Sequence, residues 1–211
     1  MTPDLHLQTG LAQLPLVAIL RGLTPPEAPA IGQALVQAGF GLLEVPLNSP
    51  QPLDSIAALV AQHPGQLIGA GTVMSAADVR NVQAAGGRLI ISPHFDVDVV
   101  REALRLGLAC MPGVATPSEA FAALRAGAHA LKLFPAEMIG PAVVKALRAV
   151  LPRGVPLLPV GGIATGNMAA YRQAGATGFG IGSALYAPGQ SAGQTAQAAQ
   201  AFITAWRAAA A

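Results

Sequence analysis

The sequence predicts a single (β/α)8 barrel, the TIM-barrel fold, with one extra helix before its first strand. Short apolar runs typical of buried strands alternate eight times with alanine-rich helical patterns, in units of roughly 20–25 residues. The strand runs lack strict apolar–polar alternation, which indicates strands covered on both faces. A length of 211 residues suits one domain of this kind, and we expect residues 1–211 to form it. The main alternative is an open, doubly wound sheet.

The predicted strands are short apolar runs bounded by glycine, proline or polar turns. In chain order they are Leu16–Leu20, Leu42–Val45, Leu67–Ala70, Leu89–Ile91, Leu108–Met111, Ala130–Phe134, Val155–Val160 and Gly178–Ile181. The additional helix is predicted over Leu5–Leu14, before the first of them.

The helices between these strands are predicted from alanine-rich patterns with start and stop signals. Proline recurs in their first turns, where its missing N–H group costs nothing, and glycine directly follows several of them, where it accepts the left-handed conformation. The predicted helices are Pro25–Ala38, Pro52–Gln62, Ala76–Ala85, Val97–Leu106, Pro117–Ala126, Pro141–Val150, Asn167–Ala174 and Ala192–Ala208.

The composition argues against several classes of protein. Charged residues make up 10% of the chain and the net charge is +2, without a basic run, whereas a nucleic-acid surface needs clustered basic and aromatic residues. No apolar stretch is long enough to predict a membrane span, and the N-terminus does not resemble a secretory signal. Cys110 is the only cysteine, which is consistent with a reducing compartment and leads us to expect a cytoplasmic protein. The scarce charge also suggests a surface partly covered by other subunits.

The fold predicts where functional residues should lie, because TIM-barrel active sites form at the C-terminal ends of the strands. Polar or glycine residues that close an apolar strand are therefore the candidates. Taken in order they are Arg21, Glu44, Gly71-Thr72, Ser92-Pro93, Pro112-Gly113, Lys132, Gly161-Gly162 and Gly182-Ser183.

Lys132 is one of only two lysines in the chain, and it lies between leucines in a predicted buried strand. Burial disfavours the ammonium form and lowers the pKa of a lysine. A neutral amine is a nucleophile toward carbonyl groups. The other lysine, Lys145, lies in a predicted helix and is interpreted as a solvated charge.

Glu44 is the one carboxylate inside a strand-like run. Burial raises the pKa of a carboxyl group, which suits proton exchange near neutral pH. The structural alternative is an ion pair with Lys132 or Arg21, and the two interpretations are compatible. The guanidinium of Arg21 fits a carboxylate or phosphate, or else pairs with a surface acid. Thr72 could bind an anion through its hydroxyl, or cap the following turn.

The strongest binding signal is the pair of glycine segments after the seventh and eighth strands, Gly161-Gly162 and Gly182-Ser183. Glycines there let backbone N–H groups approach an anion, and phosphate sites of TIM barrels form at these strand ends. Phe134 and Met138 are expected to supply apolar packing near the lysine. The four histidines lack metal-ligand spacing, so neither a metal nor a cofactor is expected.

Together these residues indicate Schiff-base chemistry on a phosphorylated keto acid. The chain resembles the class I aldolases that cleave 2-keto-3-deoxy-6-phospho sugar acids. The segments that carry this resemblance span nearly the whole chain in order: Ile19-Leu20-Arg21-Gly22, Leu43-Glu44-Val45-Pro46-Leu47-Asn48-Ser49-Pro50, Ile68-Gly69-Ala70-Gly71-Thr72-Val73, Leu131-Lys132-Leu133-Phe134-Pro135, Val160-Gly161-Gly162 and Gly182-Ser183.

The resemblance implies a role for each matching residue. Lys132 would form the imine and Glu44 would move protons, while Arg21 and Thr72 would hold the keto-acid carboxylate. Pro93 and Phe134 would form the apolar wall beside the imine. The 6-phosphate would bind at Gly161, Gly162, Gly182 and Ser183. The family usually forms trimers, so a homotrimer is implied as well.

Within this family the chain is most similar to the galactonate branch, which implies pyruvate and D-glyceraldehyde 3-phosphate as products. Asn48 stands where gluconate-type relatives commonly carry an arginine, and Val160 stands where they carry a threonine. Exchanging a hydroxyl for a methyl near C4 would alter which C4 epimer is preferred. The alternatives are the same chemistry on the gluconate epimer, a phosphate-binding epimerase or isomerase, and a non-catalytic phosphosugar-binding protein.

Overall fold

The computed structural model describes residues 3–209, in which nine strands and nine helices alternate except that β5 and β6 are consecutive. The strands are β1 (Leu16–Ile19), β2 (Leu42–Pro46), β3 (Leu67–Gly71), β4 (Leu89–Ile91), β5 (Ala109–Met111), β6 (Gly113–Val114), β7 (Leu131–Leu133), β8 (Leu157–Pro159) and β9 (Phe179–Ile181). The helices are α1 (Pro3–Gln13), α2 (Ala28–Ala38), α3 (Pro52–Gln62), α4 (Ala76–Ala84), α5 (Val97–Arg105), α6 (Pro117–Ala126), α7 (Pro141–Val150), α8 (Met168–Gln173) and α9 (Ala192–Ala208).

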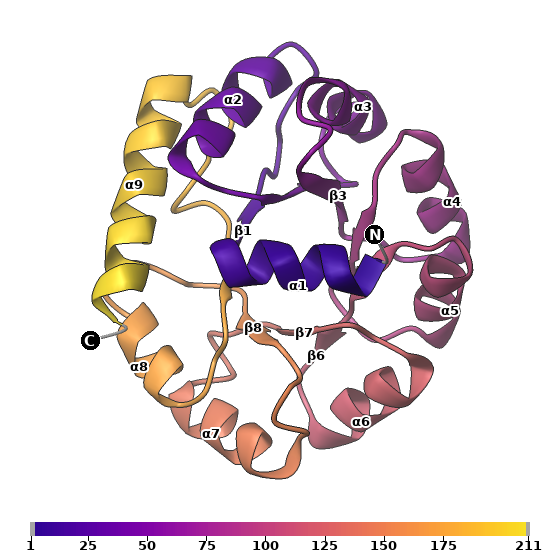
Figure 1. Ribbon diagram of the computed structural model, residues 1–211, viewed down its shortest axis with the longest axis vertical. Helices are drawn as coiled ribbons and strands as arrows, with labels where there is room; N and C mark the ends of the chain where they lie inside the picture. The colour runs from indigo at the N-terminus through magenta and orange to yellow at the C-terminus, as the bar shows by residue number, and fades with distance from the viewer. Residues whose placement is uncertain (1–2, 210–211) are drawn as a thin grey trace.

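All paired strands run parallel and form a curled sheet of TIM-barrel type. Six strands are hydrogen-bonded in the order β5-β4-β3-β2-β1-β9, so the last strand of the chain pairs with the first. Three more follow the order β6-β7-β8, and a single parallel bridge joins Val160, just after β8, to Gly180 in β9. Figure 1 shows α2 to α9 as a ring around the strands. The C-terminal ends of all strands therefore lie on one side of the sheet.

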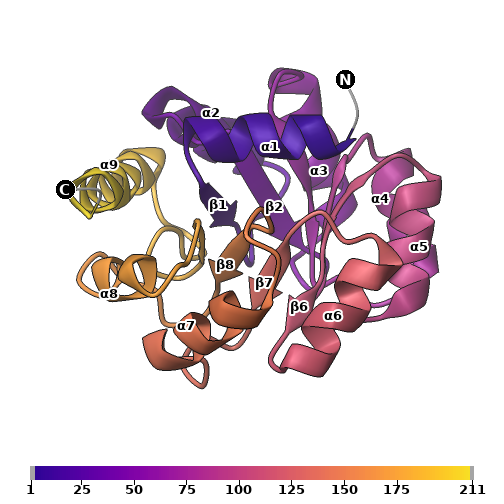
Figure 2. The ribbon, with the colours of Figure 1, turned by 60° about the horizontal axis from the view of Figure 1, so that its bottom comes forward.

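The inner face of the curled sheet is apolar at the end where the strands begin. Leu42, Leu89, Ala130 and Leu158 belong to one buried cluster there. Helix α1 covers this end, because Leu7 is fully buried in the same cluster; Figures 1 and 2 show α1 lying across the strands rather than in the surrounding ring. Side chains on the inner face further along the strands are thereby directed toward the opposite, C-terminal end.

Most helix bounds agree with the sequence prediction, and α3, α6, α7 and α9 match it residue for residue. Local capping explains this agreement. Thr116 and Glu119 form a reciprocal capping box at the start of α6, and Gly127 ends that helix at a φ of 100°.

Other elements differ from the prediction by one or two residues at their ends, and two differences are larger. Helix α2 begins at Ala28 rather than Pro25, because the Glu27 carboxylate accepts hydrogen bonds from the backbone N–H and hydroxyl of Thr24, which holds the preceding residues in a turn. The fifth predicted strand, Leu108–Met111, corresponds to β5, and the structure adds a short strand that was not predicted, β6, after Pro112, which has no N–H group to donate to a ladder. Among the described helices, none is long and apolar enough to cross a membrane.

Candidate active site

Lys132 lies in the middle of β7, and only 5% of its surface is exposed. It is two residues after Ala130, so both side chains lie on the inner face of the sheet, with Lys132 nearer the C-terminal end. Burial lowers the pKa of Lys132, an effect that Glu44 opposes and Arg21 assists. The ammonium nitrogen lies 4.6 Å from the centre of the Phe134 ring. The predicted burial of this lysine is therefore confirmed.

Glu44 occupies the corresponding position in β2, two residues after Leu42, and is 1% exposed. Burial raises the pKa of its carboxyl group to about 7, against the opposing effects of Lys132 and Arg21. The carboxylate lies against Gly71: a Cβ atom on that glycine would be 2.0 Å from Oε2 of Glu44. Only glycine therefore leaves room for this carboxylate at the end of β3.

Glu44 forms no ion pair with Lys132 or Arg21 among the described residues, so the structural alternative is not observed. Within residues 3–209 the ion pairs join Glu102 to Arg80 and Arg105, on the helical surface. Oε2 of Glu44 is buried and has no hydrogen-bond partner. A buried carboxylate oxygen without a partner is costly for folding, so the position of Glu44 points to a role in chemistry rather than in stability.

The raised pKa of Glu44 predicts how stability depends on pH. Its folded-state pKa of about 7 exceeds the ordinary value of 4.5, so the folded state retains a proton that the unfolded chain releases. This contribution is fully present below about pH 4.5 and is lost as the pH rises through 7. We expect it to reduce the free energy of unfolding by on the order of 2–3 kcal/mol between pH 4.5 and 8. Urea denaturation of wild type and Glu44→Gln across this range measures it, since the difference between the two proteins should change with pH; a constant difference would contradict the assignment.

Arg21 follows β1 and is exposed at the same end of the sheet. Its guanidinium donates a hydrogen bond to the side-chain oxygen of Asn48, which follows β2. The residue after Arg21 is also hydrogen-bonded to the residue after Asn48: the Gly22 N–H donates to Oγ of Ser49 at 2.9 Å. Asn48 thus orients the arginine, a role that the sequence did not predict.

A cleft of about 380 Å³ opens at this end of the sheet, between β1 and the segments that follow β7, β8 and β9. It brings together seven of the nine predicted substrate-binding residues. They are Arg21, Phe134, Val160, Gly161, Gly162, Gly182 and Ser183. The glycine segments thus form part of one concave surface, which we call the glycine cup, defined as Gly161, Gly162, Gly182 and Ser183.

Thr72 and Pro93 do not line this cleft but lie beside the two buried charged residues. Thr72 follows Gly71 and has a φ of 57°, a left-handed conformation that is strained for a β-branched residue. A Cβ atom added to Gly113 would be 2.4 Å from the carbonyl group of Pro93. Gly113 is the partner of Lys132 in the pairing of β6 with β7, so Pro93 lies close to the lysine. Met138 does not pack near the lysine as predicted: it is 79% exposed, because it lies on the solvent side of the turn after β7.

Two residues in this region were missed by the sequence analysis. The amide of Asn167 donates to the Gly162 carbonyl at 2.8 Å and accepts from the Ala164 N–H at 3.0 Å, so it fixes the turn that carries the first half of the cup. Glu137, on the turn after β7, also lines the cleft. Asn167 could have been found from its position at the start of a predicted helix, where asparagine often binds backbone groups. No sequence motif indicated Glu137.

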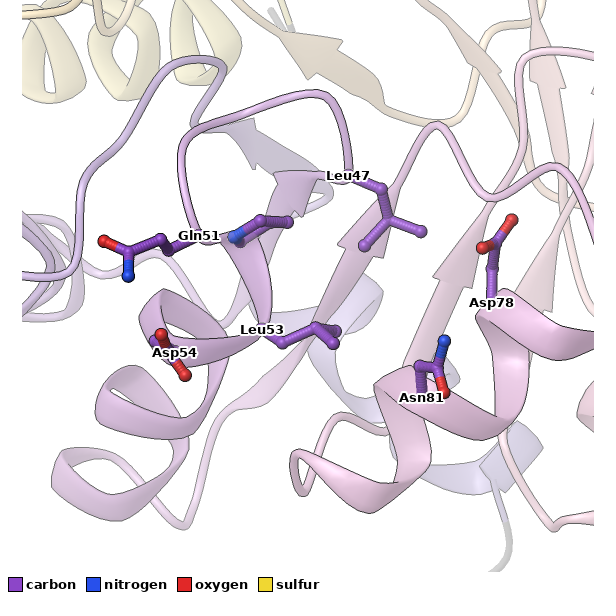
Figure 3. Close-up of a pocket in the computed structure, with 7 residues that line it drawn as sticks. Leu47, Gln51, Leu53, Asp54, Asp78 and Asn81 are labelled. Carbon is purple, nitrogen blue, oxygen red and sulfur yellow. The ribbon is translucent and has the colours of Figure 1, made fainter.

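A second cleft, of about 370 Å³, lies on the outside of the sheet between α3 and α4. Figure 3 shows Leu47 and Leu53 reaching into it, with Asp78 and Asn81 on its α4 side. Asp78 is already engaged, since its carboxylate accepts from the Met74 N–H at 3.0 Å. No lysine, histidine or cysteine lines this cleft. The first cleft is lined by Phe134, and the ammonium nitrogen of Lys132 lies 4.6 Å from the centre of that ring.

Other reactive groups in the described residues do not form a competing site. Burial raises the pKa of the Cys110 thiol to about 12, so it stays protonated and unreactive at neutral pH. Residues 3–209 contain no cluster of three or more His, Cys, Asp or Glu side chains that could hold a metal ion. The cleft beside Lys132 and Glu44 is therefore the candidate active site.

Comparison with known proteins identifies the family. The family model for KDPG and KHG aldolases matches residues 7–200, which include every strand and the candidate site. The chain belongs to the KDPG and KHG aldolase family. It is accordingly a carbon–carbon lyase, and the resemblance inferred from the sequence is confirmed.

Curated relatives agree with the galactonate branch of this aldolase family. A probable 2-dehydro-3-deoxy-6-phosphogalactonate aldolase of Rhizobium meliloti is 49% identical over 91% of both chains. The 2-dehydro-3-deoxy-6-phosphogalactonate aldolase of Escherichia coli is 48% identical over 92% of this chain and 96% of its own. Relatives named as phosphogluconate aldolases are more distant, such as that of Zymomonas mobilis at 37% identity over 65% of both chains.

Solved structures confirm the TIM-like arrangement of the aldolase. A native KDPGal structure superposes with a TM-score of 0.92 at 48% identity, covering 94% of this chain and 97% of the other. The KDPG aldolase of Legionella pneumophila, solved with pyruvate captured as a covalent carbinolamine, has a TM-score of 0.82 at 27% identity and covers 96% and 98% of the two chains.

Proposed function

We propose that this aldolase cleaves 2-dehydro-3-deoxy-6-phospho-D-galactonate to pyruvate and D-glyceraldehyde 3-phosphate through a Schiff base on Lys132. The observation that carries the proposal is that one lysine and one glutamate are both buried on the inner face of the sheet. Lys132 and Glu44 are 5% and 1% exposed, and each alters the pKa of the other. The cleft that contains the glycine cup is lined by Phe134, over whose ring Lys132 lies, and by Arg21, which acts on both pKa values.

In the first step Lys132 acts as the nucleophile. Burial lowers the pKa of its ammonium group, which increases the fraction of neutral amine that attacks the C2 ketone. Loss of water then gives a protonated imine, whose positive charge draws electrons from the C3–C4 bond. The bond to C4 breaks, and C3 becomes the nucleophilic carbon of an enamine of pyruvate. Because the imine serves as the electron sink, the mechanism requires no metal.

Glu44 moves the protons that this cleavage releases and consumes. A carboxyl group with a pKa of about 7 is partly ionised at neutral pH, so it can accept a proton in one step and return it in another. It takes the C4 hydroxyl proton, directly or through one water, as the aldehyde leaves. The same proton can then be delivered to C3 of the enamine, and hydrolysis of the resulting imine frees pyruvate.

The two ends of the substrate carry negative charges and bind at different places. We assign the C1 carboxylate to Arg21 and Thr72, since the guanidinium is held by Asn48 at the mouth of the site and suits a planar carboxylate. We assign the 6-phosphate to the glycine cup, where backbone N–H groups can approach an anion closely. Phe134 and Pro93 form an apolar wall beside the imine.

Val160 is the residue we assign to the choice between C4 epimers. It is 5% exposed, lines the cleft, and packs against the position where a Cβ atom on Gly180 would lie. A threonine at this position would place a hydroxyl where the valine has a methyl. A hydroxyl that loses or gains a hydrogen-bond partner alters binding by about one to a few kcal/mol.

Measuring pyruvate release from both C4 epimers tests the assigned substrate. We expect kcat/KM to be greater for the galactonate epimer, and Val160→Thr to reduce this preference by about tenfold, equivalent to ~1.4 kcal/mol. Val160→Ile, which keeps an apolar side chain, is the control and should retain the preference. Equal turnover of both epimers by the wild type would identify an enzyme of dual specificity, and faster turnover of the gluconate epimer would contradict the proposal.

Three further properties accompany this function. We infer that the curled sheet is a closed (β/α)8 barrel with α1 across one end and that the whole chain forms one domain, an arrangement supported by the β1–β9 pairing and the Val160–Gly180 bridge. We infer a homotrimer, supported by the low content of charged residues, 10%. We also place the activity in the cytoplasm, supported by the single, buried cysteine.

A further inference from the structure

The glycine cup has an acidic side chain lying over it. A Cβ atom added to Gly161 would be 2.2 Å from Oε2 of Glu137, and one added to Gly162 would be 3.1 Å from its Cγ and 3.3 Å from its Oε1. These distances mean that the Glu137 carboxylate rests directly on the surface of the two glycines. It therefore covers the half of the cup formed by Gly161 and Gly162, to which the proposed function assigns part of the terminal phosphate of the substrate.

The backbone that carries Glu137 is firmly held, while its side chain is exposed. The N–H of the preceding residue, Ala136, donates to the Val160 carbonyl at 2.8 Å, and the Tyr171 hydroxyl donates to the Ala136 carbonyl, also at 2.8 Å. The turn is closed by the Ile139 N–H, which donates to the Pro135 carbonyl at 3.2 Å. A change of side-chain rotamer is therefore sufficient to move the carboxylate off the cup without moving the turn.

Glu137 forms no ion pair within the described residues, so a basic partner does not explain its position. Arg21, the other charged residue of the cleft, is hydrogen-bonded to Asn48 instead. The feature that a carboxylate and a phosphate share is negative charge, and a surface built to attract one also attracts the other.

We propose that Glu137 is a resident anion of the glycine cup, which the terminal phosphate of the substrate must displace on binding and which returns when the phosphorylated product leaves. This inference rests on the proposed function, since it assumes that the cup binds phosphate. Glu137 thereby weakens phosphate binding, both because its contact with the cup is lost and because two negative charges are brought close together. It also favours release of glyceraldehyde 3-phosphate, because the carboxylate takes the vacated place.

The direct test is calorimetric titration of inorganic phosphate into wild type, Glu137→Gln and Glu137→Asp. Removing an exposed charge near a bound anion should tighten phosphate binding by about two- to fivefold in Glu137→Gln. Glu137→Asp, which keeps the charge, should bind phosphate like the wild type or between the two. Asp54→Asn, which removes one negative charge on α3 beside the outer cleft, controls for the change in net charge and should leave the affinity unchanged.

Kinetics provide a second measurement of the same displacement. In Glu137→Gln the KM for the phosphorylated substrate should fall by a similar factor, while the pyruvate concentration that half-saturates trapping by borohydride should stay the same. Unchanged or weaker phosphate binding in Glu137→Gln, or equal tightening in Asp54→Asn, would overturn the inference. Failure of pyruvate trapping in the wild type would instead overturn the proposed function, so the two failures are distinguishable.

Discussion

Lys132→Ala should abolish cleavage of the phosphorylated keto acid, with a loss in kcat/KM on the order of 10⁴-fold or more, because the covalent route no longer exists. Burial makes the amine of this residue nucleophilic, and the other lysine of the chain, Lys145, lies in α7. The folded structure should persist, since Lys132 forms no ion pair within residues 3–209 that the substitution would break. Steady-state pyruvate release and the circular-dichroism melting curve are the measurements.

The chain offers a matched control, because its other lysine lies on the exposed face of α7. Lys145→Ala removes the same functional group from the surface and should leave kcat/KM within about twofold of wild type. Substantial turnover by a folded Lys132→Ala protein would eliminate the imine mechanism. A comparable loss in Lys145→Ala would show that the assignment of the two lysines is reversed.

Glu44→Gln is expected to slow cleavage by roughly two or more orders of magnitude, because an amide cannot accept the C4 hydroxyl proton. The pH profile gives a more specific expectation. Burial raises the pKa of Glu44 to about 7, and the ionised form is the base, so kcat should rise with pH through the neutral range. The profile of kcat is the informative one, since Lys132 no longer titrates as an amine once the imine has formed.

In Glu44→Gln this acidic limb of the kcat profile should disappear. Glu44→Asp keeps a carboxylate but withdraws it from the reacting atoms, so it should be slower than wild type while keeping a pH-dependent rise. An unchanged rate in Glu44→Gln, or the same acidic limb in both variants, would remove Glu44 from the role of proton carrier.

The positions of Lys132 and Glu44 were predictable because burial and chain periodicity suffice to place them. Side chains alternate between the two faces of a strand, so a charged residue inside a short apolar run lies on a definite face. In a parallel sheet the C-terminal ends of the strands lie together, and the active site of this fold forms there. The helix bounds followed from local chemistry for the same reason, as the capping box of Thr116 and the terminating Gly127 act within a few residues.

The residues that escaped prediction act through side-chain contacts between segments distant in the sequence. Asn48 holds Arg21 across 27 positions of the chain, and Glu137 lies over glycines more than 20 positions later. A polar residue in a loop carries no periodic signal that reveals such a partner. Strand β6 was missed for a different reason, since the proline before it, Pro112, marks the end of a strand or an interruption equally well.

Borohydride reduction in the presence of pyruvate, followed by intact mass and peptide mapping, tests the central claim most directly. Reduction of an imine fixes pyruvate to the amine that formed it, so one adduct per chain should appear, located on the peptide that contains Lys132 and absent from Lys132→Ala. An unmodified mass, or an adduct located on Lys145 or the N-terminal amine, would contradict the account.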